Sequence, residues 1–379
     1  MFSMFFKNAW IFTEEGWIYG GFEVTEDGKF GVIGISQHPD DAIDLKKGKV
    51  IPGLVDVHIH GAMGSDFSDG DPAGLRNMAR YLLKEGITAF TPASMTLPYD
   101  VLEKAYATGK ALAEEAPADC ARIMGAHMEG PYFSKKKKGA QNGAYLRDPD
   151  IEGFRRLYEK SDGFIKIVDI APELPGAAEF VASVKSLCTV SIAHTDSDYD
   201  HAKVAIDAGV THLTHLFNTM PGIHHRNPGV IPAAAENENV RAELICDGIH
   251  VHPSSVRLAF RLFGADRIIL ISDTLRCCGM PNGEYELGGQ TVYLNGDVGK
   301  LTDGTIAGAV TNLFEGMRRA MQFGIAEADA IRAATINPAR SIGAAAQIGS
   351  IETGKFADFV VCNADYSKKH VYRSGKKVS

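Results

Sequence analysis

The segment PGLVDVHIHG, residues 52–61, ends in two histidines, His58 and His60, that are separated by one residue. In a β-strand, residues i and i+2 point to the same face, so these imidazoles would project together from a strand end. Neutral imidazole nitrogen is a common ligand of zinc and similar divalent metals. Taken alone, the pair is as compatible with two ordinary loop histidines as with a metal site, so residues elsewhere have to decide.

Further polar residues follow strand-like segments along the rest of the chain. Glu129, His194 and His215 each end an apolar segment, His250 follows another, and Asp273 ends the last one. A lone histidine in such a position is more often a core residue. Several such residues at the carboxyl-terminal edge of one barrel, where barrel enzymes hold their active sites, indicate a metal centre instead.

These residue types define the chemistry of the predicted centre. Glu129, His194 and His215 offer one carboxylate and two imidazoles, enough to hold a divalent metal with a position open for water. His58 and His60 can hold a second metal if Glu129 bridges the two positions. The sequence therefore predicts one or two divalent metals, zinc or iron, since both accept this ligand set.

Two of these residues are predicted to handle protons and the substrate oxygen. A bound divalent metal lowers the pKa of water to about 7. The Asp273 carboxylate can take the proton of that water and later return it to a leaving amine. His250 can donate to the substrate oxygen or polarise its carbonyl. The predicted reaction is metal-assisted hydrolysis of an amide-like bond.

The elements that must position these residues alternate along the middle of the chain. Strand-like segments, several of them apolar almost throughout, are predicted at 55–60, 87–93, 122–129, 164–170, 188–194, 211–215, 241–248 and 267–273. Helices are predicted at 75–83, 98–115, 150–160, 176–187, 199–208, 254–263, 311–323 and 327–335. This alternation favours an α/β fold of the (β/α)8 TIM-like barrel type. A doubly wound open sheet is the alternative, although no G-x-G-x-x-G motif follows any strand.

The two ends of the chain differ from this middle part. Residues 1 to about 50 contain short strand-like stretches separated by Glu-Glu-Gly and Glu-Asp-Gly turns, and 349–355 and 358–362 are again strand-like. We therefore expect residues 1–51 and 345–379 to form one small β-sandwich domain. Residues 52–344 are expected to form the barrel.

Composition limits the class of protein and its surroundings. Hydrophobic residues make up 45% and charged residues 23% of the 379 residues, which is typical of a globular protein with a large core. The net charge of −8 argues against nucleic-acid binding. Six scattered cysteines favour free thiols, and neither a signal peptide nor an apolar stretch of about 18 residues is visible. We expect a cytoplasmic protein without nucleic-acid or membrane partners.

For several residues near the predicted centre, we expect an ordinary structural role rather than metal binding, ligand binding or reactivity. His127 shares a strand face with the predicted carboxylate ligand and is expected beside the metal ligands rather than among them. The basic run Lys135–Lys138 and Arg276 are expected in solvated loops, with help in binding an anionic ligand as the alternative. Cys277 and Cys278 are expected to be unreactive thiols, because no neighbour marks them as low-pKa thiolates.

Longer motifs extend this interpretation across nearly the whole chain. They are PGLVDVHIHG at 52–61, HMEGPYFSKKKKGAQN at 127–142, THLFNTMPGIHHRNPG at 214–229, CDGIHV at 246–251, SDT at 272–274 and GTIAGA at 304–309. Together they resemble the amidohydrolase superfamily and, within it, the N-acetylglucosamine-6-phosphate deacetylases. The superfamily's carboxylated lysine has no counterpart, because the fourth strand ends near Asp169, so Glu129 would take the bridging role.

The resemblance implies a role for each residue that matches a motif. Glu129, His194 and His215 become the principal metal ligands, with Asp273 as general base and acid. His250 becomes a contact to the substrate near its amide or its sugar. Members with the His-x-His pair can hold a second metal.

The resemblance also implies a substrate site. Gln141, Asn218 and the backbone of Thr219 would hold the sugar and the phosphate, and Ala307 would line the pocket. Arg226 would bind the phosphate, and in this family it can come from the neighbouring subunit of a dimer.

Together these expectations describe a homodimeric enzyme that hydrolyses the N-acetyl group of N-acetylglucosamine 6-phosphate to glucosamine 6-phosphate and acetate. One alternative is an amidohydrolase that acts on another N-acyl amino sugar or on a cyclic amide. Another is a non-catalytic barrel that serves in assembly. Such a barrel should have lost some of the residues that end its strands, whereas all of them are present.

Overall fold

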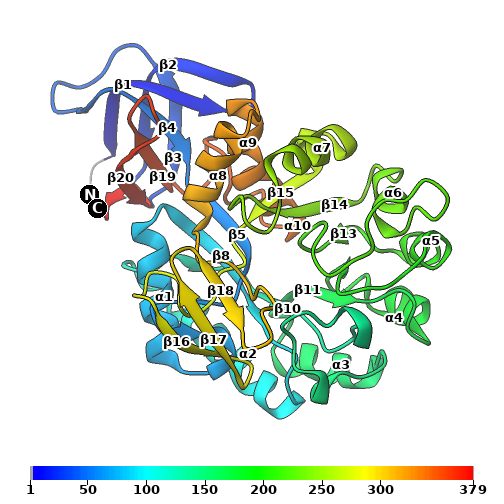
Figure 1. Cartoon of the computed structure of the whole chain (residues 1–379). Helices are drawn as coiled ribbons and strands as arrows, with labels where there is room; N and C mark the ends of the chain where they lie inside the picture. Colours follow the sequence, from blue (N-terminus) through cyan, green and yellow to red (C-terminus); the bar gives the residue numbers. More distant parts are fainter. Residues whose placement is uncertain (1–2, 379) are drawn as a thin grey trace.

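Within residues 3–378, which the computed structural model describes, eight parallel strands form the central barrel (Figure 1). They are β5 (Leu54–Ile59), β8 (Ile87–Ser94), β10 (Ala126–Met128), β11 (Ile165–Ile170), β12 (Thr189–Ile192), β13 (His212–Leu213), β14 (Arg241–Ile245) and β15 (Ile268–Ile271). Neighbours in sequence are neighbours in the sheet. The ring closes where the Asp273 amide donates to the His58 carbonyl at 2.9 Å and the His60 amide to the Thr274 carbonyl at 3.0 Å. The predicted (β/α)8 barrel is confirmed.

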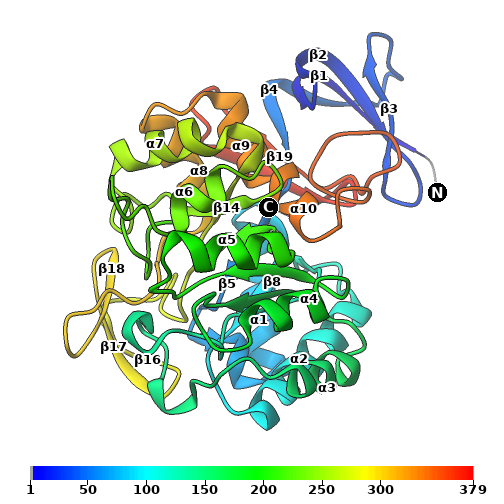
Figure 2. The same ribbon diagram turned by 90° about the vertical axis from the view of Figure 1, so that its right-hand side faces the viewer.

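The strands are apolar because both of their faces are covered. Every residue of β5 and β8 is buried, as expected for parallel strands with side chains inside the barrel and helices outside. Helices surround the barrel in Figures 1 and 2. They are α1 (Pro72–Lys84), α2 (Tyr99–Glu115), α3 (Ile151–Lys160), α4 (Ala177–Val184), α5 (Tyr199–Ala208), α6 (Val230–Ala235), α7 (Pro253–Phe263), α8 (Leu313–Gln322), α9 (Glu327–Ala334) and α10 (Ile336–Ser341).

Local sequence explains why these helices form where they do. In α1, Asp71 caps the first turn by accepting hydrogen bonds from the Ala73 and Gly74 amides, and Pro72 occupies the first helical position. The apolar residues of α1 recur at intervals of three and four and are buried against the barrel. Four 3₁₀ turns lie in the connections among the described residues: η1 (Phe67–Asp69), η2 (Lys135–Lys137), η3 (Gly143–Tyr145) and η4 (Ala265–Arg267).

Strands from both ends of the chain form a small β domain, seen at the upper left in Figure 1. Its mixed sheet contains β1 (Met4–Thr13), β2 (Gly16–Val24), β3 (Phe30–Ile35), β4 (Ile43–Pro52), β19 (Phe359–Cys362), β20 (Lys368–Arg373) and β21 (Lys376–Lys377). β19 pairs antiparallel with β4 and so joins the two ends. The domain has its own core. In it, the ring centroid of Phe6 lies 4.9 Å from that of Phe22 and 5.2 Å from that of Phe359. The predicted β domain built from both termini is confirmed.

Two predicted strands differ from the structure. Residues 349–355 contain no strand; they form turns and bends, with Gly354 at φ +91°, and Phe356 pairs with Lys29 in an isolated bridge. The segment 122–129 is broken into β9 (Arg122–Ile123) and β10 at Gly125. Gly125 has φ +144°, and a Cβ there would come within 2.3 Å of the Lys166 side chain, so this break in the strand requires glycine.

A three-stranded antiparallel sheet, which sequence reasoning did not predict, lies between β15 and α8. It consists of β16 (Gly283–Leu287), β17 (Gln290–Asn295) and β18 (Val298–Leu301), and it stands at the edge of the molecule in Figure 2. Its apolar side chains share a small core with Met95, Leu275 and Ala307, at the carboxyl-terminal side of the barrel. A short hairpin of β6 (Gly61–Ala62) and β7 (Ser65–Asp66) follows β5. Among the described residues, none of the helices has the length and apolar character needed to cross a membrane.

Candidate active site

Three side chains meet where β10, β12 and β13 end. Glu129, His194 and His215 are buried, with at most 4% of their surface exposed. Glu129 Oε1 lies 3.1 Å from His194 Nε2 and 3.2 Å from His215 Nε2, and the two Nε2 atoms are 3.1 Å apart. One carboxylate oxygen and two imidazole nitrogens therefore face one point, an arrangement able to hold a metal ion.

A second group of ligand atoms adjoins the first. It contains His58 and His60 from the end of β5 and Asp273 from the end of β15. His60 Nε2 lies 3.1 Å from Glu129 Oε2 and 3.3 Å from Asp273 Oδ1, while His58 Nε2 lies 3.6 Å from both Glu129 Oε1 and Asp273 Oδ1. The oxygens of Glu129 thus face both groups, which is the geometry of a bridging carboxylate.

Hydrogen bonds on the far side of the rings show that these histidines fit a metal. His194 Nδ1 lies 3.0 Å from the Lys137 carbonyl and His60 Nδ1 lies 3.2 Å from the Ala93 carbonyl. A carbonyl only accepts, so Nδ1 carries the proton and Nε2 offers its lone pair to the centre. His58 Nε2 is buried and has no hydrogen-bond partner among the described residues, as expected of an atom reserved for a metal.

The electrostatics keep the carboxylates ionised. Burial alone would raise the pKa of Glu129, but the surrounding imidazoles, those of His60 and His58 above all, hold it well below its ordinary value. Burial would likewise raise the pKa of Asp273, and His58 and His60 outweigh it and lower that pKa. Both groups are therefore negatively charged at neutral pH and able to balance a cation.

The backbone is strained at three of these positions. His194, His215 and Asp273 have φ values of 44°, 30° and 51°, in the left-handed region that residues other than glycine seldom adopt. Each residue directly follows a strand or lies within two residues of its end. The unfavourable backbone turns these side chains into the centre, and strain of this kind is concentrated at functional sites.

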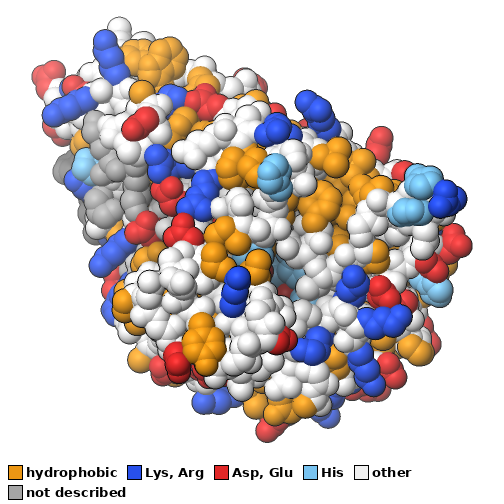
Figure 3. Space-filling model, viewed as in Figure 1, with side chains coloured by type: hydrophobic (Ala, Val, Ile, Leu, Met, Phe, Trp, Pro, Cys, Tyr) orange, Lys and Arg blue, Asp and Glu red, His pale blue; other side chains and the backbone are white. Residues whose placement is uncertain are grey.

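The members of the two groups, except the fully buried His58, line a cavity of about 180 Å³. The residues predicted to hold the substrate, except Arg226, line this cavity: Gln141, Asn218, Thr219, His250 and Ala307. One wall is apolar, because Met95, Leu275 and Leu287 of the small core beneath β16–β18 also line it. Figure 3 shows a hollow in the middle of one face of the molecule, with histidine atoms inside it.

The cavity residues already have hydrogen-bond partners within the protein. Gln141 Nε2 donates to Glu129 Oε2 at 2.5 Å, and its Oε1 accepts from the Thr96 amide at 2.8 Å. His250 Nδ1 lies 2.6 Å from Asp247 Oδ2 and its Nε2 lies 3.0 Å from the Ala307 carbonyl. Burial lowers the pKa of His250, but the bond to Asp247 outweighs it and raises that pKa overall, so the imidazolium form is favoured.

Arg226 is the one predicted substrate-binding residue that lies outside this chain's own cavity. Its side chain is exposed in the loop 221–228, where Nη1 contacts His225 Nε2 at 2.8 Å. Among the described residues, the side chains that line the cavity include neither lysine nor arginine. The cavity of one chain therefore offers a phosphate no permanent cation.

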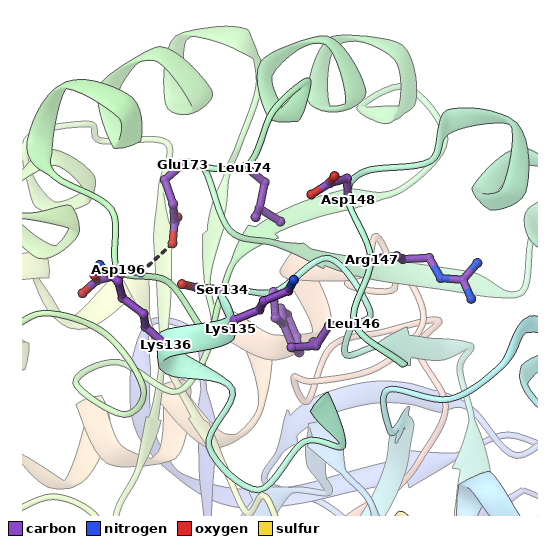
Figure 4. Close-up of a pocket in the computed structure, with 10 residues that line it drawn as sticks. Ser134, Lys135, Lys136, Leu146, Arg147, Asp148, Glu173, Leu174 and Asp196 are labelled. Atoms are coloured by element: carbon purple, nitrogen blue, oxygen red, sulfur yellow. Dashed lines mark hydrogen bonds and ion pairs between the residues drawn. The ribbon is translucent and has the colours of Figure 1, made fainter. Parts of the chain in front are cut away.

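A larger pocket of about 500 Å³ lies beside the centre (Figure 4). Its lining includes Ser134, Lys135, Lys136, Leu146, Arg147, Asp148, Glu173, Leu174 and Asp196. Phe133 also lines it and stacks on the ring of His194, with ring centroids 4.3 Å apart. Its charges are of both signs, and Lys136 pairs with Asp196 at 3.1 Å. The basic run also supplies the Lys137 carbonyl, which accepts the hydrogen bond of His194 Nδ1.

The structure also shows where the other residues predicted near the centre lie. His127 donates to Asp169 Oδ1 at 2.9 Å, and its ring lies 4.5 Å from that of His58, beside the ligands as predicted. The prediction that Arg276 lies in a solvated loop is wrong, because its side chain is only 15% exposed and pairs with Asp69 at 2.8 Å. Burial raises the pKa of Cys277 to about 11 and of Cys278 to about 12, so both are unreactive thiols, as expected.

Sequence reasoning missed a layer of buried polar side chains beneath the centre. Asp56 on β5, His212 on β13 and Glu243 on β14 are completely buried, and Asp247 holds His250. The available signal was an ionisable residue within an otherwise apolar strand, as in LVDVHI and RAELI. Buried charges of this kind are kept only when they are paired.

Comparison with known proteins agrees with this geometry. The chain matches the Amidohydrolase family over residues 49–378. It is 35% identical to an N-acetylglucosamine-6-phosphate deacetylase of Bacillus subtilis (strain 168), with 96% of this chain and 94% of the relative covered. An N-acetylgalactosamine-6-phosphate deacetylase of Escherichia coli O157:H7 is 30% identical, with 97% of each chain covered.

A solved structure extends the likeness to three dimensions. A mutant N-acetyl-D-glucosamine-6-phosphate deacetylase of Mycobacterium smegmatis, in complex with N-acetyl-D-glucosamine-6-phosphate, has a TM-score of 0.94 to this chain at 29% identity, with 100% of both chains covered. The chain therefore belongs to the amidohydrolase family, which is metal-dependent, and within that family it is similar over nearly its whole length to the N-acetylglucosamine-6-phosphate deacetylases.

Proposed function

We propose that this protein is a metal-dependent deacetylase that hydrolyses N-acetylglucosamine 6-phosphate to glucosamine 6-phosphate and acetate. The observation that carries the proposal is the joint group of Glu129, His194 and His215, with Asp273 facing the same cavity. The relatives named for this reaction are similar over nearly the whole chain, and one of the similar structures contains the same sugar phosphate.

Glu129, His194 and His215 would hold the principal metal, and His58, His60 and Asp273 would surround a second position bridged by Glu129. Such a divalent ion supplies Lewis acidity, which polarises an amide carbonyl and lowers the pKa of water that it binds. Zinc or iron is proposed, because both accept imidazole and carboxylate ligands.

Asp273 would act as general base and then as general acid. Its carboxylate is ionised, as the direction of its pKa shift indicates, and it faces the cavity beside the proposed metal positions. It can accept the proton of the attacking water at a carboxylate oxygen and deliver it to the leaving amine nitrogen of the sugar. The same residue then serves both halves of the reaction and ends in its starting protonation state.

His250 would stabilise the negative charge that develops on the substrate. The bond to Asp247 favours the imidazolium, so both ring nitrogens carry a proton. The Nε2–H now donates to the Ala307 carbonyl at the cavity wall, and a substrate oxygen or phosphate that enters the cavity can take that hydrogen bond.

Phosphate binding is proposed to need a second subunit. Gln141, Asn218, the Thr219 backbone and Ala307 line the cavity around the proposed sugar and phosphate positions. Because that lining carries no lysine or arginine among the described residues, we propose that Arg226 of a partner chain supplies the cation in a homodimer. A cytoplasmic location is part of the same proposal, supported by the free thiols of all six cysteines.

A second candidate substrate is N-acetylgalactosamine 6-phosphate. The relative from Escherichia coli O157:H7 that is named for it is 30% identical over 97% of this chain. A cyclic amide is a weaker alternative, because β11 ends at Asp169-Ile170 and has no lysine at that end for carboxylation.

The test is acetate release from four reactions: N-acetylglucosamine 6-phosphate, N-acetylgalactosamine 6-phosphate, unphosphorylated N-acetylglucosamine, and the first substrate with a chelator. Release from the first compound that is fastest and is lost with the chelator supports the proposal. Faster acetate release from N-acetylgalactosamine 6-phosphate would mean that this compound, the second candidate, is the substrate. Release from none, with metal still bound, refutes both candidates.

A further inference from the structure

Glu243 is an ionised side chain in the barrel interior that no step of the proposed reaction uses. It lies on β14 in the segment RAELI and is 0% exposed. Its carboxylate accepts three hydrogen bonds, from His58 Nδ1 at 2.9 Å, His212 Nε2 at 3.0 Å and the His215 amide at 3.2 Å.

The bond from His58 fixes which nitrogen faces the centre. An ionised carboxylate only accepts, so the ring proton lies on Nδ1 and the lone pair lies on Nε2. His58 Nε2 lies 3.6 Å from Glu129 Oε1 and 3.6 Å from Asp273 Oδ1. In the other tautomer an N–H group would occupy that place, and an N–H group cannot bind a metal.

We propose that Glu243 is a positioning residue for the second metal position, because it holds His58 in the orientation and tautomer that offer Nε2 to the metal. Glu243 Oε2 also accepts a hydrogen bond from the backbone amide of His215. The same oxygen therefore contacts His215 of the first ligand group and the ring of His58 in the second. This inference rests on the proposed two-metal centre.

A neighbouring buried carboxylate provides a matched control. Asp169 on β11 is also 0% exposed and also accepts two side-chain hydrogen bonds, from His127 Nε2 and Thr214 Oγ1, each at 2.9 Å. It forms no hydrogen bond to any residue of the two ligand groups in the part of the chain that the structure describes. Loss of its charge perturbs the barrel interior without releasing His58.

The experiment uses the full chain freed of metal by chelation and then titrated with Zn²⁺, with bound metal counted by mass spectrometry and affinities measured by calorimetry. Glu243→Gln keeps an acceptor oxygen but removes the charge, and Glu243→Leu removes the acceptor as well. Partners of this kind typically change metal affinity about 10- to 100-fold. We expect the second Zn²⁺ to bind about 10-fold more weakly in the Gln variant and about 100-fold more weakly in the Leu variant. The first Zn²⁺ should bind as in the wild type, and Asp169→Asn should keep both.

Three results would overturn the inference. One is wild-type affinity for the second Zn²⁺ in the Glu243 variants. Another is equal weakening in Asp169→Asn, which would mean that any loosening of the barrel interior has this effect. The third is a wild-type chain that binds a single Zn²⁺, which refutes the two-metal proposal itself and is seen without any variant. Circular dichroism and Tm verify folding, and if Glu243→Leu does not fold, Glu243→Gln decides.

Discussion

Arg226 allows the sharpest test of how the phosphate is bound, because it lies outside the cavity of its own chain. Its side chain is exposed, and the cavity lining contains neither lysine nor arginine among the described residues. The raised pKa of His250 also favours a cation in the cavity, but that charge is already balanced by Asp247. A phosphate bound in the cavity should therefore depend strongly on a guanidinium from another subunit.

The expected size of the effect follows from the bond type. Hydrogen bonds to charged groups contribute about 1.5–3 kcal/mol. With about 1.4 kcal/mol per tenfold change, Arg226→Ala should raise KM for the phosphorylated sugar about 10- to 150-fold. KM for the unphosphorylated sugar should not change. Arg147→Ala is the matched control, because Arg147 is an exposed arginine that lines the neighbouring pocket of Figure 4. A raised KM in the Arg147 variant alone would place the phosphate in that pocket.

A mixed dimer tests whether Arg226 acts across the subunit interface. Arg226→Ala and Asp273→Asn chains with different tags are co-expressed and the mixed dimer is isolated. If Arg226 serves the partner's cavity, one site of the mixed dimer has both an intact Asp273 and an intact Arg226, so about half of the wild-type activity returns. If Arg226 serves its own chain, neither site is complete. A mixed dimer no more active than its parents refutes the reasoning.

Three further predictions concern the centre itself. Asp273→Asn should lower kcat about 10²- to 10⁴-fold, the usual contribution of a general base, while metal analysis still finds the ion at Glu129; a variant that keeps more than a tenth of wild-type kcat would exclude Asp273 as the base. Replacing His58 and His60 together with alanine should reduce bound metal from two equivalents towards one, and an unchanged metal count would mean that only one position is ever filled. Asp247→Asn removes the partner that raises the pKa of His250, so this pKa should fall and the basic limb of the kcat/KM profile should move to lower pH. A basic limb at the wild-type pH would show that protonation of His250 does not limit the reaction.

The meeting of the candidate ligands at one rim could be predicted from the sequence because it obeys simple geometry. A barrel brings every strand end to one rim, so each polar residue after an apolar segment falls on that rim regardless of the distance in sequence. The two-residue period of a strand placed His58 and His60 on the same side, and both now face Glu129 within 3.6 Å. The prediction required only the strand ends to be right within a residue or two.

Contacts between side chains of different strands were beyond this reasoning. Nothing in RAELI shows that Glu243 meets His58, because that contact depends on the register of strands that are far apart in sequence. The β16–β18 sheet had a recognisable signal, since Gly288-Gly289 and Gly296-Asp297 form two-residue hairpin turns that contain glycine. It was missed because its strands are short, largely exposed and outside the alternation of strands and helices. The burial of Arg276 went unpredicted for a related reason, since its partner Asp69 lies near the opposite end of the barrel sequence.

The first and last strands of the barrel pair with each other beside the proposed centre. The amide of Asp273 bonds the carbonyl of His58, and the amide of His60 bonds the carbonyl of Thr274, so the first and last strands join at the residues that form the second ligand group. During synthesis, the group of Glu129, His194 and His215 is complete long before β15 emerges, whereas Asp273 reaches the histidines of β5 only after the ring has closed. The proposed base therefore comes together with His58 and His60 only when the first and last strands of the barrel pair, so any loosening of that pairing should separate the base from the second ligand group.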